Sequence, residues 1–175
     1  MLDLGCGSGA LLKRLASEPR FTRIVGLDAS YDALAEAERW LDDEPLAARE
    51  RITLLHESFT MRSVALQGYD AAAMVETIEH IPPRLLSRVE GAVFGFAAPA
   101  TVVITTPNHE YNARLGRPEG SYRHPDHEFE WTRVKFRSWA SGIAERNGYR
   151  VEFGGIGPSD PLLGAPTQAG IFRLR

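Results

Sequence analysis

The 175-residue sequence contains a single cysteine, Cys6, so it cannot form an internal disulfide, as is typical of proteins from reducing compartments. It has no apolar run as long as a membrane-spanning helix, and it does not open with a charged segment followed by the apolar core of a secretory signal. No internal repeat or low-complexity segment is present. These absences predict a soluble, cytoplasmic protein with no membrane partner.

An excess of positive charge is also lacking. The formal net charge of −3 does not indicate a nucleic-acid binder, and 43% hydrophobic with 25% charged residues is ordinary globular composition. The charge is uneven, because residues 1–100 carry ten Lys/Arg and fifteen Asp/Glu, whereas residues 101–175 carry ten and eight. Six of the later basic residues lie between Arg114 and Arg137. This pattern fits either a local positive surface or a solvated face.

Apolar periodicity predicts alternating strands and helices. The expected strands are 1–5, 23–28, 51–56, 69–76, 101–108, 150–157 and 168–175. The expected helices are 6–16, 31–41, 82–94 and 131–149, and residues 108–131 are expected to form a long irregular loop. This order predicts an α/β fold, with a mostly parallel seven-stranded sheet and helices on both faces.

Residues 1–175 are predicted to form a single domain, because the chain is too short for two well-buried ones. Met1 lies inside the first expected strand, with no helix before it. We therefore expect this domain to lack its N-terminal helix, either because it is cut from a longer protein or because the start codon is mis-set.

The segment LDLGCGSG, residues 2–9, follows the first strand and opens the first helix. Glycines such as Gly5 and Gly7 let the backbone approach a ligand, and Asp28 at the end of the second strand can accept hydrogen bonds from ribose hydroxyls. The spacing Gly5-x-Gly7-x-x-Ala10 is compatible with a nicotinamide dinucleotide. A purely structural glycine turn is a third interpretation.

The pattern Asp-x-Gly-x-Gly-x-Gly, beginning at Asp3, resembles the first motif of class I S-adenosylmethionine-dependent methyltransferases. The resemblance implies a Rossmann-like fold in which this acid faces the cationic methionine end of the cofactor. It also implies that Ser58, in the segment HESF after the third strand, borders the adenine.

The segment VETIEHIPP places Glu76, Glu79 and His80 directly after an apolar strand. Unpaired charges are costly at the edge of a buried strand, so these groups need a partner. If the chain turns helical there, the two acids are i, i+3 neighbours on one face. Oxygen ligands with an imidazole suit magnesium or manganese, and one cysteine excludes an all-thiolate zinc site. The alternative is an acidic helix N-terminus with an ordinary surface histidine.

The expected loop offers two further histidines, His124 and His127. Its pattern R-x-x-D-H-x-F-E-W-T-R resembles the signature of the Hua-enhancer-type small-RNA 2′-O-methyltransferases, in which E-x-x-E-H and TPN occur at matching places. The resemblance covers essentially the whole chain. The loop residues that carry it are Arg123, Asp126, His127, Phe129, Glu130, Trp131, Thr132 and Arg133.

The resemblance implies that one divalent cation is held by Glu76, Glu79, His80 and His127. It also implies that Asp3, Gly5, Gly7, Asp28 and Ser58 bind S-adenosylmethionine. His124 is the rival to His127, and Asp126 is a candidate to orient His127. In bacterial relatives this domain is the C-terminal part of a longer protein that works with a polynucleotide kinase-phosphatase in RNA repair.

Four loop residues leave alternatives open. Phe129 and Trp131 are expected to pack in the core rather than to stack on bases. Arg123 and Arg133 are candidates either for phosphate contacts or for internal ion pairs with Glu130 or with the nearby aspartate.

The expected reaction is methylation of the 2′-hydroxyl of an RNA 3′-terminal nucleotide. A divalent cation lowers the cost of forming the alkoxide, and the same ion would grip the adjacent 3′-hydroxyl, which selects a free 2′,3′-diol. His80 or His127 would accept the proton if the metal leaves it free. Two alternatives are a metal-assisted catechol O-methyltransferase, since a catechol is also a vicinal diol, and a nucleotide-sensing module without catalysis.

Overall fold

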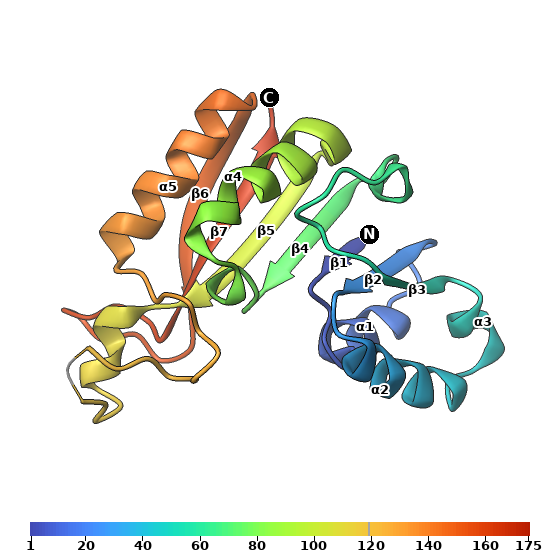
Figure 1. Cartoon of the computed structure of the whole chain (residues 1–175), viewed down its shortest axis with the longest axis horizontal. Helices are drawn as coiled ribbons and strands as arrows, with labels where there is room; N and C mark the ends of the chain where they lie inside the picture. Colours follow the sequence, from blue (N-terminus) through green and yellow to red (C-terminus); the bar gives the residue numbers. More distant parts are fainter. Residues whose placement is uncertain (119) are drawn as a thin grey trace.

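The computed structural model describes residues 1–118 and 120–175. Their hydrogen bonding forms one seven-stranded sheet of order β3-β2-β1-β4-β5-β7-β6 (Figure 1). All neighbours are parallel except the pairs β5–β7 and β6–β7. The strands are β1 (Leu2–Leu4), β2 (Ile24–Asp28), β3 (Ile52–His56), β4 (Ala71–Val75), β5 (Thr101–Pro107), β6 (Tyr149–Ile156) and β7 (Thr167–Leu174).

The main helices lie where apolar periodicity predicts them. They are α1 (Ala10–Ala16), α2 (Tyr31–Asp42), α4 (Leu86–Val89) and α5 (Arg133–Arg146), and the short helix α3 (Leu46–Arg49) was not predicted. Helix α4 follows a 3₁₀ turn, Pro83–Leu85, and continues as the π-helix Glu90–Ala97. The side chain of Ser30 caps α2, and that of Thr132 caps α5, each by accepting a backbone N–H three residues on.

Helices cover both faces of the sheet, as predicted. Side chains alternate along β2, so Val25 and Leu27 join the apolar cluster that includes α5, whereas Ile24 joins the cluster that includes α1. Figure 1 shows α1, α2 and α3 beside β1–β3, with α4 and α5 beside β4–β7. Among the described helices, none combines the length and the apolar character that crossing a bilayer requires.

The segment predicted as a long loop, 108–131, is largely irregular, with one 3₁₀ helix at His109–Ala113. It follows β5 and leads into α5, so it lies at the edge where the parallel strands end (Figure 1). Asn108 and Trp131 form an isolated bridge that closes this segment at its base. The loop is thereby fixed next to the ends of β4 and β5.

Candidate functional site

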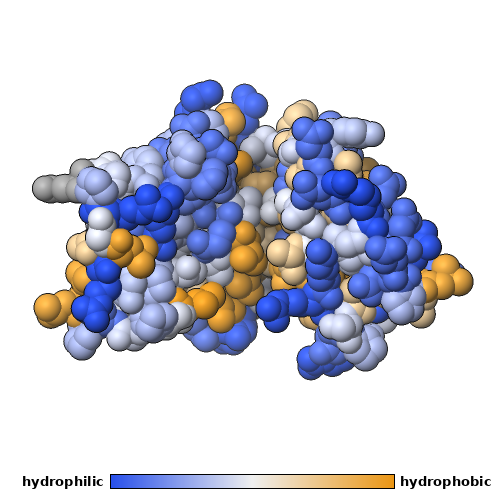
Figure 2. All heavy atoms as spheres, turned by 90° about the horizontal axis from the view of Figure 1, so that it is seen from below, coloured by the Kyte–Doolittle hydropathy of each residue, from blue (hydrophilic) through white to orange (hydrophobic). Residues whose placement is uncertain are grey.

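A cleft of about 380 Å³ opens where β1, β2 and β4 end. Several predicted site residues from four separate segments line it, namely Gly5, Gly7, Asp28, Ser58, Glu76 and His80. Figure 2 views this edge of the molecule and shows a furrow with apolar side chains between the portion carrying α1–α3 and the portion carrying α5. The parallel sheet has therefore gathered residues that are far apart in the sequence.

The glycine loop is held against β2 by backbone hydrogen bonds. Gly5 has a φ of 77° and lies against the side chain of Thr77, so a larger residue would be strained and would clash. The Asp28 carboxylate accepts hydrogen bonds from the N–H groups of Gly7 and Ser30, each at 2.8 Å. Asp28 thus orders the loop and presents its remaining lone pairs to the cleft that it lines.

Asp3 is the most unusual charged group of the glycine loop. Its side chain is 2% exposed, and Oδ2 has no hydrogen-bond partner among the described residues. Burial, followed by the nearby negative charge of Asp28, raises the pKa of Asp3 to about 7. A buried, unpaired carboxylate is costly, and a ligand with a cationic group would relieve that cost.

Ser58 lines the cleft from the segment after β3. Its hydroxyl pairs with Thr60 Oγ1 at 2.8 Å and accepts the Thr60 N–H. These bonds fix the orientation of the hydroxyl at the wall of the cleft.

Glu76 adopts a conformation that the sequence did not predict. Its φ of 50° is left-handed, which is uncommon for a residue other than glycine, and the short 3₁₀ turn begins only at Ile78. Glu76 and Glu79 are therefore not i, i+3 neighbours on one helical face, and that expectation was wrong. The Glu76 carboxylate instead accepts a hydrogen bond from Thr105 Oγ1 at 3.0 Å. Burial raises its pKa.

Glu79, His80 and His127 form a compact cluster, and His80 also lines the cleft. One potential ligand atom from each lies within 4.8 Å of the others. Glu79 is fully buried, and its Oε2 accepts a hydrogen bond from Thr106 at 2.9 Å, whereas Oε1 has no partner within the described part of the chain. Burial raises the pKa of Glu79 to about 8. Of the four residues implied as metal ligands, the structure brings three into one group, with Glu76 outside it.

Hydrogen bonds fix the tautomers of both histidines. His80 Nδ1 lies 3.2 Å from the Asp126 carbonyl oxygen, and His127 Nδ1 lies 2.7 Å from Glu130 Oε1. A carbonyl and a carboxylate only accept, so each Nδ1 carries a proton, and in a neutral ring the free lone pair is then on Nε2. Burial, with the nearby His127, also lowers the pKa of His80 and favours its neutral form. Each Nε2 can therefore take either a cation or a proton.

Glu130 positions His127, a role for which the sequence suggested Asp126. The buried Glu130 carboxylate also accepts hydrogen bonds from the backbone N–H of Arg123 and from Asn112 Nδ2. Burial raises the pKa of Glu130, but these bonds and the one from His127 bring it below its usual value. The carboxylate of Asp126 is exposed and lies 3.7 Å from His124 Nδ1.

His124 lies outside the compact cluster. Its ring centroid is 6.1 Å from that of His80 and 5.7 Å from that of His127. Its Nδ1 accepts the backbone N–H of Asp126 at 3.2 Å. The geometry therefore favours His127 over His124 as the loop's contribution to the cluster.

The aromatic and basic loop residues have structural partners. Phe129 and Trp131 are each 5% exposed and stack at 4.2 Å, as expected for core residues. Arg123 donates to Asn112 Oδ1 and to a backbone carbonyl. Arg133 pairs with Glu110 at 2.6 Å, so both arginines are held internally, but not by the predicted ion pairs.

The sequence did not predict the residues that form hydrogen bonds to the acids in and around the cluster. Thr105 and Thr106 hold the two acids, and Asn112 holds Glu130. Two successive threonines at the end of a buried strand were the available signal, because their hydroxyls need partners where β5 meets β4. No local pattern pointed to Asn112.

Comparison with known proteins agrees with this architecture. Residues 2–93 match a family described as a methyltransferase domain. A small RNA 2′-O-methyltransferase of Rattus norvegicus is 38% identical over 98% of this chain, which spans 45% of that protein. The chain thus spans about half the length of the curated relatives it matches.

Solved structures extend the comparison. The methyltransferase domain of bacterial CtHen1 matches with a TM-score of 0.89 and 42% identity, covering 99% of this chain and 89% of that one. A chain of the Pnkp1/Rnl/Hen1 RNA repair complex, at 20% identity, has the same fold, with a TM-score of 0.73 over 98% of this chain and 37% of that one. These matches confirm the predicted Rossmann-like fold of class I S-adenosylmethionine-dependent methyltransferases. The chain belongs to the Hen1-type small RNA 2′-O-methyltransferase family and corresponds to its methyltransferase domain.

Proposed function

We propose that this domain transfers a methyl group from S-adenosylmethionine to the 2′-oxygen of the 3′-terminal nucleotide of an RNA. The observation that carries the proposal is the cluster Glu79, His80 and His127, which adjoins the glycine-loop cleft through His80. One cleft would then hold the methyl donor while the neighbouring cluster holds the acceptor. Family membership supports RNA as the acceptor.

The cleft is suited to S-adenosylmethionine. Asp3 offers a buried, unpartnered oxygen for the ammonium of the methionine end, and Asp28 offers acceptors for the ribose hydroxyls. Ser58 would border the adenine. When bound, this cofactor supplies the methyl group as an electrophile on a cationic sulfur. The chain's part is to hold donor and acceptor in line and to exclude water.

The cluster is suited to one divalent cation. Glu79 presents an unpartnered buried oxygen, and His80 and His127 present unprotonated Nε2 atoms. Glu76 is the fourth ligand proposed, because its carboxylate lies at the same strand end and lines the same cleft. Oxygen and imidazole donors suit manganese or magnesium. When bound, such an ion supplies Lewis acidity to the hydroxyls of the acceptor.

The four proposed metal ligands indicate the chemical nature of the methyl acceptor. Four protein ligands leave two positions of a six-coordinate ion, which the adjacent hydroxyls of one ribose can fill. Only a 3′-terminal nucleotide has both hydroxyls free. A site that contacts both hydroxyls loses binding free energy when one of them is missing, because its own polar groups are left without a partner. An RNA end that lacks either hydroxyl should therefore be rejected.

We further propose that the natural protein works in RNA repair or end protection, with a polynucleotide kinase-phosphatase as a partner. The fold shared with a chain of the Pnkp1/Rnl/Hen1 complex supports that idea. The test is co-purification of this domain, within its full-length protein, with such an enzyme.

The test of the activity is transfer of radiolabelled methyl groups to a set of RNA ends. We expect transfer to an RNA with a free 2′,3′-diol, and a methylated product that resists periodate. RNAs ending in 2′-deoxy, 3′-deoxy or 3′-phosphate should be poor acceptors. Efficient transfer to internal riboses or to a 3′-phosphorylated RNA would contradict the proposal, and preferred transfer to a catechol would favour the small-molecule alternative.

A further inference from the structure

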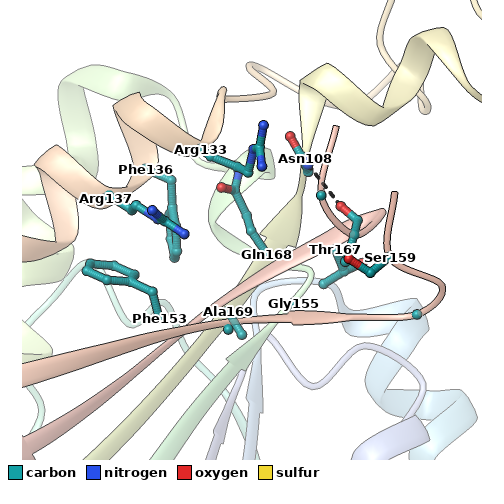
Figure 3. A pocket seen from close by; sticks show the side chains of 14 residues that line it. Asn108, Arg133, Phe136, Arg137, Phe153, Gly155, Ser159, Thr167, Gln168 and Ala169 are labelled. Carbon is teal, nitrogen blue, oxygen red and sulfur yellow. Dashed lines mark hydrogen bonds between the residues drawn. The ribbon is translucent and has the colours of Figure 1, made fainter. Parts of the chain in front are cut away.

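A second cleft, of about 280 Å³, lies between α5 and the ends of β6 and β7. Figure 3 shows Phe136 and Arg137 of α5 near Phe153 of β6, whereas the Arg133 side chain points away from Phe153 and lies near Gln168. The cleft lies at the edge of the sheet where β5 ends, because Asn108, the residue after β5, also lines it. None of its lining residues takes part in the site proposed above.

The charge of this cleft is positive and only partly compensated. Arg133 pairs with Glu110 at 2.6 Å and also donates to the Leu162 carbonyl oxygen. Arg137, one turn further along the helix, is exposed and forms no ion pair within residues 1–118 and 120–175. Residues four apart share one helix face, so Arg137 lines the cleft beside Arg133, and Glu110 is the one acid whose pKa both arginines lower among the described residues. An anionic group is the complementary ligand.

An aromatic surface lies next to that charge. The Arg137 guanidinium is 5.7 Å from the centre of the Phe153 ring, which is half-buried. The Phe153 side chain lines the cleft and is only half-buried, so part of its ring is open to a planar group in the cleft. Positive charge beside an accessible aromatic ring is the usual combination for single-stranded nucleic acid.

The side chain of Gln168 provides a second, independent observation that this cleft can bind a ligand. The side chain is 5% exposed, and its Nε2 donates to the carbonyl oxygens of Pro107 at 3.1 Å and Trp131 at 2.8 Å. These two acceptors fix the amide orientation, because Oε1 in the same place would face other oxygens. Oε1 is left with no donor among the described residues. An N–H donor from a ligand in the cleft would satisfy it.

The two clefts are close enough for one RNA strand. Thr106 of β5 holds Glu79 of the cluster, and Asn108 of the second cleft comes two residues later along the same extended segment. Two residues of strand span about 7 Å. An RNA whose terminal ribose lies at the cluster can therefore reach the second cleft with the nucleotides just before its 3′ end.

We propose that the cleft between α5 and β6 binds a nucleotide upstream of the 3′ terminus of the acceptor RNA. Its phosphate is held by Arg137 with Arg133, its base lies on Phe153, and a base N–H donates to Gln168 Oε1. The inference rests on the proposed function for the identity of the ligand. It adds a site that recognises RNA length, whereas the metal cluster recognises only the terminal ribose.

The experiment compares binding of diol-ended oligoribonucleotides of two, three and four nucleotides, measured by calorimetry with S-adenosylhomocysteine and Mn²⁺ present. We expect affinity to rise about tenfold between the dinucleotide and the tetranucleotide. Arg137→Gln should abolish that rise and lower the dependence on salt by about one phosphate contact. Arg14→Gln, an exposed arginine on α1, is the matched control and should retain the rise.

A photochemical cross-linking experiment locates the base of the bound nucleotide. RNA with 5-iodouridine at the penultimate or preceding position should cross-link to the peptide containing Phe153, and Phe153→Leu should remove the adduct. Equal affinities for all lengths, an unchanged rise in Arg137→Gln, or cross-links only elsewhere would overturn the inference. Tighter binding of an acidic peptide than of the tetranucleotide at this cleft would overturn it as well. Absence of methyl transfer to every acceptor by wild type and Arg14→Gln would instead contradict the proposed function, and the binding data would still decide this inference.

Discussion

The two halves of the candidate site are built in different ways. The cofactor half depends on contacts between a strand end and the loop beside it, such as Asp28 accepting the N–H groups of Gly7 and Ser30. The cluster half joins the end of β4 to a loop about 50 residues later, because the Glu79 carbonyl oxygen accepts the Glu128 N–H and His80 Nδ1 bonds to the Asp126 carbonyl oxygen. The first half is therefore a local motif, whereas the second exists only after the chain has folded.

This difference has consequences for the energetics. In both halves a buried acid has an oxygen with no hydrogen-bond partner among residues 1–118 and 120–175, Asp3 Oδ2 in one and Glu79 Oε1 in the other. Burial raises the pKa of Asp3 to about 7 and that of Glu79 to about 8. Both sites are thus costly without a ligand, and each fits a cation of a different kind. If the halves are separate binding centres, a change in one should leave ligand binding in the other intact.

The largest expected effect comes from breaking the cluster. Glu79→Gln or His127→Ala should abolish methyl transfer, and chelation of divalent ions should do the same to the wild type, because the donors for the ion are lost. Binding of S-adenosylhomocysteine, measured by calorimetry, should persist in both variants. Glu128→Gln, an exposed neighbour, is the control. Full activity after exhaustive chelation would refute the role of the cluster.

A smaller effect is expected when the hydrogen bond that orients His127 is weakened. Glu130→Gln keeps the shape of the side chain but weakens the acceptor for His127 Nδ1. Loss of such an orienting partner typically costs 10–100-fold in metal affinity, so activity should fall at low Mn²⁺ and recover at high Mn²⁺. Asp126→Asn, which alters the exposed acid nearby, should change neither. A loss in Glu130→Gln that no Mn²⁺ concentration restores would show that Glu130 does not act through the metal.

In the cofactor half, Asp28→Asn should weaken S-adenosylhomocysteine binding by about 1–2 kcal/mol, because charge-assisted hydrogen bonds become neutral ones. Mn²⁺ binding should be unaffected. A parallel loss of Mn²⁺ affinity would show that the two halves are one coupled unit. Tighter binding of NAD than of S-adenosylhomocysteine by the wild type would contradict the assignment of this cleft.

The smallest effect is a pH dependence caused by Asp3. Its folded-state pKa is raised to about 7 from 3.8, so its contribution to stability is present below pH 4 and is lost as the pH rises through 7. A cationic ligand prefers the ionised form, so the stabilisation by S-adenosylhomocysteine should grow over the same window. Thermal unfolding with and without the ligand should show this trend, and Asp3→Asn should flatten it. An identical trend in Asp3→Asn would assign it to another group.

The sequence predicted where the glycine loop and Asp28 meet, because the signals for both are local. The Asp3–Gly9 segment and Asp28 follow two adjacent strands, so their meeting at one edge follows from the sheet alone. All seven strands were expected close to their observed positions for the same reason, since apolar periodicity identifies each one separately.

The cluster half was predicted only in part. Family resemblance selected His127 over His124, but the backbone at Glu76 was wrongly expected to be helical, because its left-handed φ has no signal in a residue other than glycine. The partner of His127 was missed because Asp126 and Glu130 are both near in sequence, and only the folded loop buries one and exposes the other. Side-chain networks between distant segments have no periodicity from which to predict them.

The central claim is that a cation-binding cluster and a cofactor cleft are separate centres that meet at one edge of the sheet. Its most direct test is titration of Mn²⁺ into the wild type, Glu79→Gln and His127→Ala by electron paramagnetic resonance, with S-adenosylhomocysteine bound. We expect one ion per wild-type chain, no ion in either variant, and unchanged affinity for S-adenosylhomocysteine in all three. Absence of Mn²⁺ binding by the wild type, or equal binding by the variants, would contradict it.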